Sequence, residues 1–136
     1  MRRTLIVRIH RIANAAVRRP GLRSFRGGDL LYLTTTGNKT GKQRTTPLLH
    51  LLDEDRWIVV ASNGGSDWEP GWWLNLRAGS AAHVEIDGEM TPVAGVELDG
   101  AERERLWTAL NRMFDFEGYR AKVSRRIAVV ALSPAG

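Results

Sequence analysis

Short apolar runs separated by polar residues along the chain predict a β-rich fold. Three stretches of mainly aliphatic and β-branched residues follow one another: Leu30–Thr36, Arg44–Leu52 and Arg56–Ser62. Asp53-Glu54-Asp55 supplies polar residues for a turn between the second and the third stretch. We therefore expect three successive strands in the first half of the chain.

The second half of the chain adds a hairpin and a closing strand. Ala82–Asp87 and Met90–Leu98 flank Asp87-Gly88, a dipeptide that favours a type I′ turn. Ile127–Leu132 is apolar and β-branched, as a closing strand would be. About six strands with inserted helices predict a mainly β (α+β) fold, a small closed or split β-barrel.

Two helices are expected between these strands. Ser66 and Glu69 have the spacing of a capping box, and Pro70 would still lie in the first turn of the helix. Asp99 and Glu102 have the same spacing before a second helix. The apolar residues of that second helix share one face: Leu106, Leu110 and Met113, with Trp107 and Phe114 beside them.

The N-terminal segment carries most of the positive charge. Residues 1–28 hold eight arginines and no acid, in a chain whose net charge is +5. Thr4–Val17 places Leu5, Ile9, Ile12 and Ala16 at helical spacing, and Pro20-Gly21 ends this amphipathic helix. The helix could pack on the barrel or rest on an anionic membrane surface. Packing is favoured, because the stripe lacks aromatic anchors.

Composition excludes several classes of site. The 136 residues suffice for one domain, residues 1–136, with residues 1–28 as a basic helical arm. The absence of cysteine excludes disulfides and thiolate metal sites, and the three separated histidines form no ligand pattern. No membrane-spanning stretch, signal peptide or nucleic-acid-binding pattern is visible. We expect a cytoplasmic protein, with peripheral membrane contact through residues 1–19 as the open alternative.

Thr34–Arg44 reads as a basic connection between the first two strands. Gly37 and Gly41 interrupt any periodicity, and donors gather around them: Asn38, Lys39, Thr40, Lys42 and Arg44. Such a loop can surround an anionic group such as phosphate, although its glycine spacing is not that of a Walker loop. A solvated hairpin loop explains these residue types equally well.

Ala61–Arg77 contains a second candidate binding segment. Gly64-Gly65 allows a tight turn with accessible backbone amides, just before the expected tryptophan-rich helix. Amides at such a position can bind anions or polar carbonyl groups. The alternative is a plain turn in which the tryptophans only pack, since Trp73 and Leu76 have the spacing of core residues.

Taken together, these segments resemble the deazaflavin-dependent nitroreductase family of actinobacteria, split-barrel oxidoreductases that use coenzyme F420. The resemblance runs from about Leu30 to the C-terminus and rests on motifs in the same order: Leu33–Gly41, Arg44–Leu48, Ala61–Gly65, Trp72–Arg77 and Ser124–Val130. It implies that reduced F420 (F420H2) passes a hydride from C5 of its deazaflavin ring to a quinone, an activated enone or a nitroaromatic. The chain shows no catalytic constellation of its own, which suits a cofactor enzyme.

The resemblance also implies cofactor contacts. The phosphate and the glutamate tail would be held by Lys39, Thr40, Gly41 and Arg44, and the ring would be flanked by Thr46 and Pro47. Amides and a hydroxyl would come from the turn Ala61, Ser62, Asn63, Gly64 and Gly65. The pocket would be closed by Trp72 and Asn75, and the anion would be supported by Arg77. Some family members carry a lysine in place of Asn63, so one anion contact is weaker here.

Departures from the family pattern bear on the acceptor. Nitroimidazole-reducing members have several tyrosines near the substrate, whereas Met113–Tyr119 keeps only Tyr119 and Leu49 replaces another. These losses favour an apolar, planar acceptor such as a quinone. Ser62 is the candidate to hydrogen-bond the acceptor, with Tyr119 as the second catalytic candidate, although Ser62 could instead cap a strand end.

Two other functions share these features. A non-catalytic F420 carrier needs the same pocket, and an FMN enzyme on the same barrel also binds a phosphate and a tricyclic ring. The basic cluster Lys39, Lys42 and Arg44 favours the polyanionic tail of F420 over FMN. A homodimer is compatible with the sequence.

Overall fold

The structure is a computed structural model that describes residues 24–25 and 28–135. The amphipathic helix predicted over Thr4–Val17 lies outside the described residues. The strands are β1 (Ser24–Phe25), β2 (Gly28–Thr36), β3 (Gln43–Leu49), β4 (Leu51–Asp53), β5 (Arg56–Val60), β6 (Ala82–Ile86), β7 (Glu89–Glu97) and β8 (Val129–Pro134). The helices are the 3-10 turn η1 (Asn63–Gly65) and the α-helices α2 (Gly71–Arg77), α3 (Gly100–Met113) and α4 (Phe116–Arg120).

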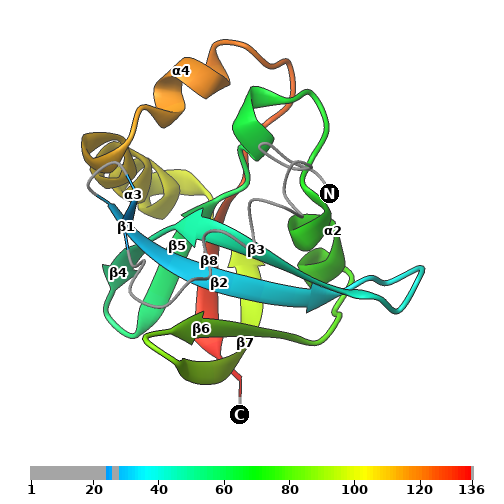
Figure 1. Ribbon diagram of the computed structural model, residues 1–136. Coiled ribbons are helices and arrows are strands. Elements are labelled where there is room, and N and C mark those ends of the chain that lie inside the picture. Colours follow the sequence, from blue (N-terminus) through cyan, green and yellow to red (C-terminus); the bar gives the residue numbers. More distant parts are fainter. Residues whose placement is uncertain (1–23, 26–27, 136) are drawn as a thin grey trace.

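The eight described strands form one antiparallel sheet that curls on itself (Figure 1). The order along the sheet is β1-β2-β6-β7-β8-β5-β4, and β3 pairs with the edge of β2 that faces away from β6. One end of the sheet is therefore β3 and the other is β4, yet these two strands are separated in sequence only by His50. Because one residue cannot span a flat sheet of this width, the sheet must bend into a barrel.

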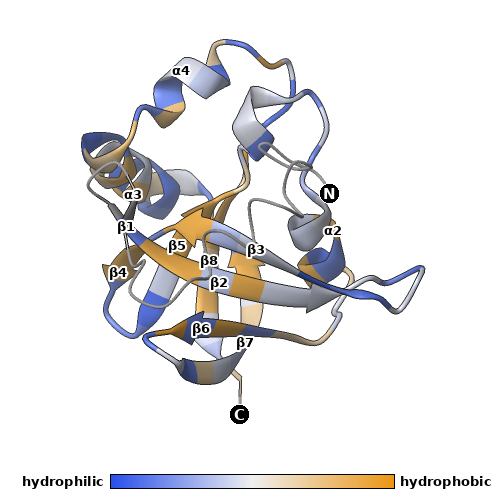
Figure 2. Cartoon of the chain, in the orientation of Figure 1, coloured by the Kyte–Doolittle hydropathy of each residue, from blue (hydrophilic) through white to orange (hydrophobic). Residues whose placement is uncertain are grey.

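The central strands β5 and β8 are buried on both faces. Side chains alternate across a strand, so Val59 and Val130 face the core that holds α2, whereas Ile58 and Val129 face the core beneath α3. The first core consists of Leu31, Leu33, Val59, Ala61, Trp72, Trp73, Leu76, Val84, Val93, Ala128, Val130 and Leu132. The second consists of Ile58, Val60, Leu98, Leu106, Trp107, Leu110, Phe116, Ile127, Val129 and Ala131. Figure 2 shows this apolar character concentrated in the middle of the sheet.

The sheet confirms most of the strands expected from the sequence. The hairpin turn has positive φ at Asp87 (53°) and Gly88 (83°), as a type I′ turn requires. The single strand predicted over Arg44–Leu52 is wrong, because the chain is divided at His50 into β3 and β4, which belong to opposite ends of the sheet. The last strand begins at Val129 and lies inside the sheet, between β5 and β7.

The predicted capping boxes are wrong in their chemistry. Ser66 follows η1 in an extended conformation, and α2 begins at Gly71 without a side-chain cap, so the expected helix starts later. Asp99 does occupy the N-cap position of α3, but its side chain accepts no capping hydrogen bond. The two glutamates of these motifs bind arginines instead: Glu69 binds Arg77, and Glu102 binds Arg56.

Candidate cofactor site

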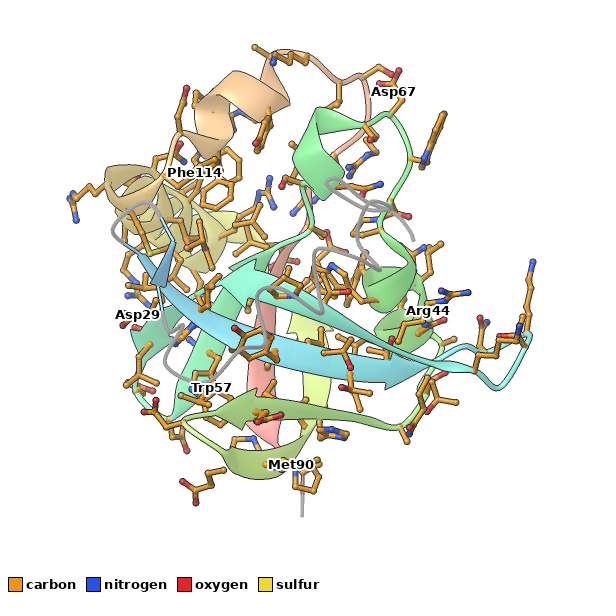
Figure 3. The ribbon with its side chains drawn as sticks, in the orientation of Figure 1. Asp29, Arg44, Trp57, Asp67, Met90 and Phe114 are labelled. Atoms are coloured by element: carbon orange, nitrogen blue, oxygen red, sulfur yellow. The ribbon has the colours of Figure 1, made fainter. Side chains whose placement is uncertain are left out.

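Two loops and one short helix bring together most of the predicted site residues. The basic loop, residues 37–42, connects β2 to β3, and the glycine turn, residues 61–66, follows β5. Figure 1 shows α2 beside the end of β2 and after the glycine turn, and Figure 3 shows Arg44 on the hairpin next to α2. Segments far apart in the sequence are therefore placed around α2.

The basic loop presents its charges to solvent. It closes through the hydrogen bonds from Gly37 N to Lys42 O and from Gly41 N to Gly37 O, both 2.8 Å. Lys39 and Lys42 of the loop and Arg44, the second residue of β3, are exposed, and within the described part of the chain none of them forms an ion pair with a carboxylate. The cations of this loop are thus available to an anionic ligand.

Asn75 anchors the basic loop to α2. Its Nδ2 donates to Thr35 Oγ1 at the end of β2 (3.0 Å), and its Oδ1 accepts from the backbone amide of Asn38 (3.3 Å). Both ends of the carboxamide are therefore used to hold the loop against the helix. The pocket-closing contact implied for Asn75 stays a prediction, but its position beside the loop has a clear structural basis.

The glycine turn has the backbone geometry of an anion-binding nest. Ser62 is right-handed (φ −79°, ψ −26°), whereas Asn63 (φ 48°), Gly64 (φ 63°) and Gly65 (φ 85°) are left-handed. A right-handed residue followed by a left-handed one makes successive amide groups converge. Asparagine tolerates this conformation better than most residues, and Asn63 Nδ2 donates to Trp68 O at 3.1 Å.

Arg125 holds the glycine turn from behind, and sequence reasoning assigned it no role. Its guanidinium donates to three carbonyl oxygens of the turn: Nη1 to Ala61 O (3.2 Å), Nη2 to Ser62 O (3.0 Å) and Nε to Ser66 O (3.1 Å). Burial lowers the pKa of Arg125. The sequence offered only a tail motif that contains Arg125, since its partners lie about sixty positions away.

Tyr119, the second catalytic candidate, lies against the same turn. A Cβ added to Gly65 would approach Tyr119 Cδ1 to 3.1 Å, so the ring covers the turn where only glycine leaves room. The ring also packs on Phe114, with centroids 5.7 Å apart. The two catalytic candidates, Ser62 and Tyr119, are therefore brought to one turn from segments that are distant in sequence.

The sequence comparisons decide which family this site belongs to. The sequence model of the family described as F420H(2)-dependent quinone reductase matches residues 6–134. The chain belongs to this family.

A curated relative and two solved structures are similar to this chain. The F420H(2)-dependent quinone reductase Rv1261c of Mycobacterium tuberculosis is 35% identical over 107 residues, which cover 76% of this chain and 72% of the relative. The solved F420-H2 dependent reductase FDR-A is 31% identical, covers 76% of this chain and 93% of its own, and has a TM-score of 0.68. A structure described as a domain-swapped dimer is 28% identical, with a TM-score of 0.70, over 90% of this chain and 96% of its own.

Membership in the F420H(2)-dependent quinone reductase family confirms several predictions. The fold is the expected split β-barrel, the enzyme class is oxidoreductase, and the cofactor of the family is reduced F420. The roles of individual residues are not tested by these similarities and stay predictions.

The other predicted site residues of this family member occupy varied environments. Thr46 is buried and pairs with Leu33, and Pro47 pairs with Tyr32. Trp72 lies on α2 and belongs to the first hydrophobic core, which it shares with Val59 and Val130. Arg77 donates to Glu69 through two hydrogen bonds of 2.9 and 3.2 Å, so its charge is already engaged by a carboxylate.

Ser62 is buried, and its hydroxyl makes no capping hydrogen bond on η1. The alternative role considered for this serine, capping the end of the preceding strand, is a different contact and stays a prediction. Among the described residues no cluster of three potential metal ligands occurs. Helices in that part of the chain are too short or too polar to cross a membrane.

Proposed function

We propose that this chain oxidises reduced F420 and reduces an apolar, planar, electron-poor acceptor, with a quinone as the first candidate. The observation that carries the proposal is the pairing of two loops around α2. One loop offers exposed positive charge that no carboxylate of the described residues pairs with, and the other offers backbone amides in a nest geometry. A cofactor with a polyanionic tail and a ring edge rich in polar atoms fits this pair.

The bound cofactor supplies the hydride, from C5 of its deazaflavin ring. Lys39, Thr40 and Gly41 of the loop and Arg44 at the start of β3 would hold the phosphate and the acidic tail, because they are exposed and their cations form no ion pair with the described carboxylates. The amides of the glycine turn would meet the pyrimidine edge, while Thr46 and Pro47 would flank the ring and Trp72 and Asn75 would close the site. Each of these roles positions the ring and excludes water from it.

The acceptor would lie where Ser62 and Tyr119 meet the glycine turn. The Ser62 hydroxyl would donate to an acceptor oxygen, and Tyr119 would offer a second donor. The surroundings of Tyr119 are apolar, because Phe114 packs on its ring and Tyr119 itself packs against the core beneath α3, as Leu49 also does. An apolar ring with carbonyl oxygens therefore fits better than a polar nitroimidazole.

The decisive experiment follows the absorbance of reduced F420 mixed with the protein and with quinones, enones or nitroaromatics. We expect turnover with quinones and little with nitroimidazoles. Binding of F420 without turnover on any acceptor would favour the carrier alternative. Equal or tighter binding of FMN in parallel fluorescence titrations would contradict the cofactor role proposed for the basic loop.

Residues 1–19 bear on where the reaction takes place. Their arginines and apolar stripe support two arrangements, packing on the barrel or contact with an anionic membrane that carries the quinone, and we expect packing. Deleting residues 1–19 should then lower the melting temperature. The membrane arrangement would be supported instead if the full chain sedimented with anionic vesicles and salt weakened this binding. Each basic residue near the surface would contribute about 1 kcal/mol to such binding.

A homodimer is a further part of the proposal. It is supported by the solved relative described as a domain-swapped dimer. Sedimentation equilibrium of the full chain measures the oligomeric state, and a monomer at all concentrations would contradict it.

A further inference from the structure

We propose that Arg125 is a positioning residue that presets the amides of the glycine turn for the cofactor, an inference that rests on the proposed function. Arg125 lies outside the turn in sequence and is not expected to touch the cofactor. Its role is argued from the geometry of the peptide groups whose carbonyl oxygens it binds.

The guanidinium uses its three nitrogens on one stretch of backbone. It binds the carbonyl oxygens of Ala61, Ser62 and Ser66 at 3.0–3.2 Å, and Nη1 also reaches the carbonyl of Arg126 at 3.3 Å. Ser62 O additionally accepts from Gly65 N at 2.9 Å. One side chain therefore fixes the direction of successive peptide planes in the turn.

Fixing a carbonyl also fixes an amide. In a trans peptide the C=O and the following N–H point in opposite directions, and none of the described peptides is cis. The Ala61 and Ser62 carbonyls point toward Arg125, so the amides of Ser62 and Asn63 point away from it. Among the described residues these two amides donate to no acceptor. They form the open side of the nest.

Lysine cannot replace this arrangement. An ammonium group is one point of charge on a single stem, whereas the planar guanidinium presents donors in several fixed directions. Arg125 is also partly desolvated, which costs free energy. The hydrogen bonds to the three carbonyl oxygens offset this cost only if all three are kept. The charge behind the peptide planes further favours an electron-rich group in front of them.

Arg126 provides a matched control. It is the next residue, carries the same charge and also binds backbone and carboxylate oxygens, at Leu98 O (3.3 Å) and Glu97 Oε2 (3.0 Å). Those contacts lie on the strand end before α3 rather than on the glycine turn. An Arg126 variant that loses these contacts therefore measures general destabilisation in a protein whose nest is unchanged.

The test compares Arg125→Lys with Arg126→Lys in the full chain. Three measurements are made: F420 affinity by fluorescence titration, melting temperature, and hydrogen exchange by NMR of the Gly65 amide, which donates to Ser62 O. We expect Arg125→Lys to weaken F420 binding about tenfold, the equivalent of about 1.4 kcal/mol, and to speed exchange at this amide. Arg126→Lys should leave both unchanged.

The NMR titration of the wild-type protein is an independent reading that needs no variant to fold. Adding F420 should shift the Ser62 and Asn63 amide protons, and their absence from the shifted set would overturn the inference. Equal binding by wild type and Arg125→Lys would overturn it too, as would equal weakening in Arg126→Lys. Wild-type protein that binds no F420 would overturn the proposed function itself and this role with it, a distinguishable result.

Discussion

The basic loop and the glycine turn lie on either side of α2 but are built in opposite ways. The basic loop exposes its side chains and is held against α2 by Asn75, which accepts a hydrogen bond from the Asn38 amide and donates one to Thr35 at the end of β2. The glycine turn offers backbone groups and is held by three hydrogen bonds from the partly buried Arg125. The first arrangement gives long-range attraction, and the second gives fixed direction. Affinity and orientation are therefore assigned to different loops, and each can be disturbed separately.

The largest effect is expected from crowding the glycine turn. In Gly65→Ala the alanine backbone must keep φ at +85°, and its Cβ must lie 3.1 Å from the Tyr119 ring. We expect the two effects together to lower the free energy of unfolding by roughly 2–4 kcal/mol. In Gly64→Ala, φ is +63° but nothing lies within 4 Å of the new Cβ, so only the backbone strain remains. Melting temperature and F420 titration measure both variants. Equal losses in the two would show that Tyr119 does not press on the turn.

Removing charge from the basic loop should act on affinity alone. Lys39→Ala and Arg44→Ala should each weaken F420 binding by about 1.5–3 kcal/mol, because a hydrogen bond to a charged group is lost. The loss should shrink as salt is raised, and melting should not change. Arg112→Ala, which removes an exposed charge from α3, serves as the control for net charge. Salt-independent losses would indicate that the loop contributes shape rather than charge.

Releasing the basic loop from α2 should act on stability and affinity together. Asn75→Ala removes the bonds to Thr35 and Asn38 and should cost about 1–2 kcal/mol of folding free energy, with weaker F420 binding. Asn111→Ala is the matched control, since Asn111 also makes two hydrogen bonds, to Trp107 O (2.9 Å) and from Glu117 N (2.7 Å), on α3. Denaturant unfolding and F420 titration should separate the two variants, and similar affinity in both would count against the anchoring role.

The smallest effect is expected away from both loops, at the ion pairs that join the β4–β5 turn to α3. Hydrogen bonds from Arg105 and Arg56 lower the pKa of Asp53 below its ordinary value of 3.8. The stabilisation is therefore fully present above that value and is lost as the pH falls through the lower folded-state pKa. Asp53→Asn should cost about 0.2–1 kcal/mol near neutral pH and leave F420 binding unchanged.

The control for Asp53→Asn is Asp55→Asn, two positions further along the same β4–β5 connection. Asp55 is exposed and, in the described part of the chain, takes no part in an ion pair. Melting curves from neutral pH down to pH 3 should show the Asp53→Asn deficit narrowing in acid, while Asp55→Asn follows the wild type. A deficit that stays constant with pH would mean that packing, not charge, explains the loss.

Local sequence patterns predicted the elements that depend on local chemistry. Asp87-Gly88 specified its hairpin turn, and the continuous apolar, β-branched runs in β5 and β8 specified strands, because both signals lie within a few residues. The division at His50 was missed, since it depends on where distant strands close the barrel. Arg125 was missed for the same reason: its carbonyl partners at positions 61–66 leave no local trace.

The position of β8 has a consequence for how the protein folds as it is made. β8 is the last described strand, yet it pairs with both β5 and β7 and contributes residues to both cores. Arg125 lies four positions before the first residue of β8. A nascent chain in which this segment has not yet been made has neither a completed barrel nor an anchored glycine turn. Folding must then await long-range pairing of β5 and β7 with β8, which is slow and leaves the edges of β5 and β7 open to aggregation until β8 arrives.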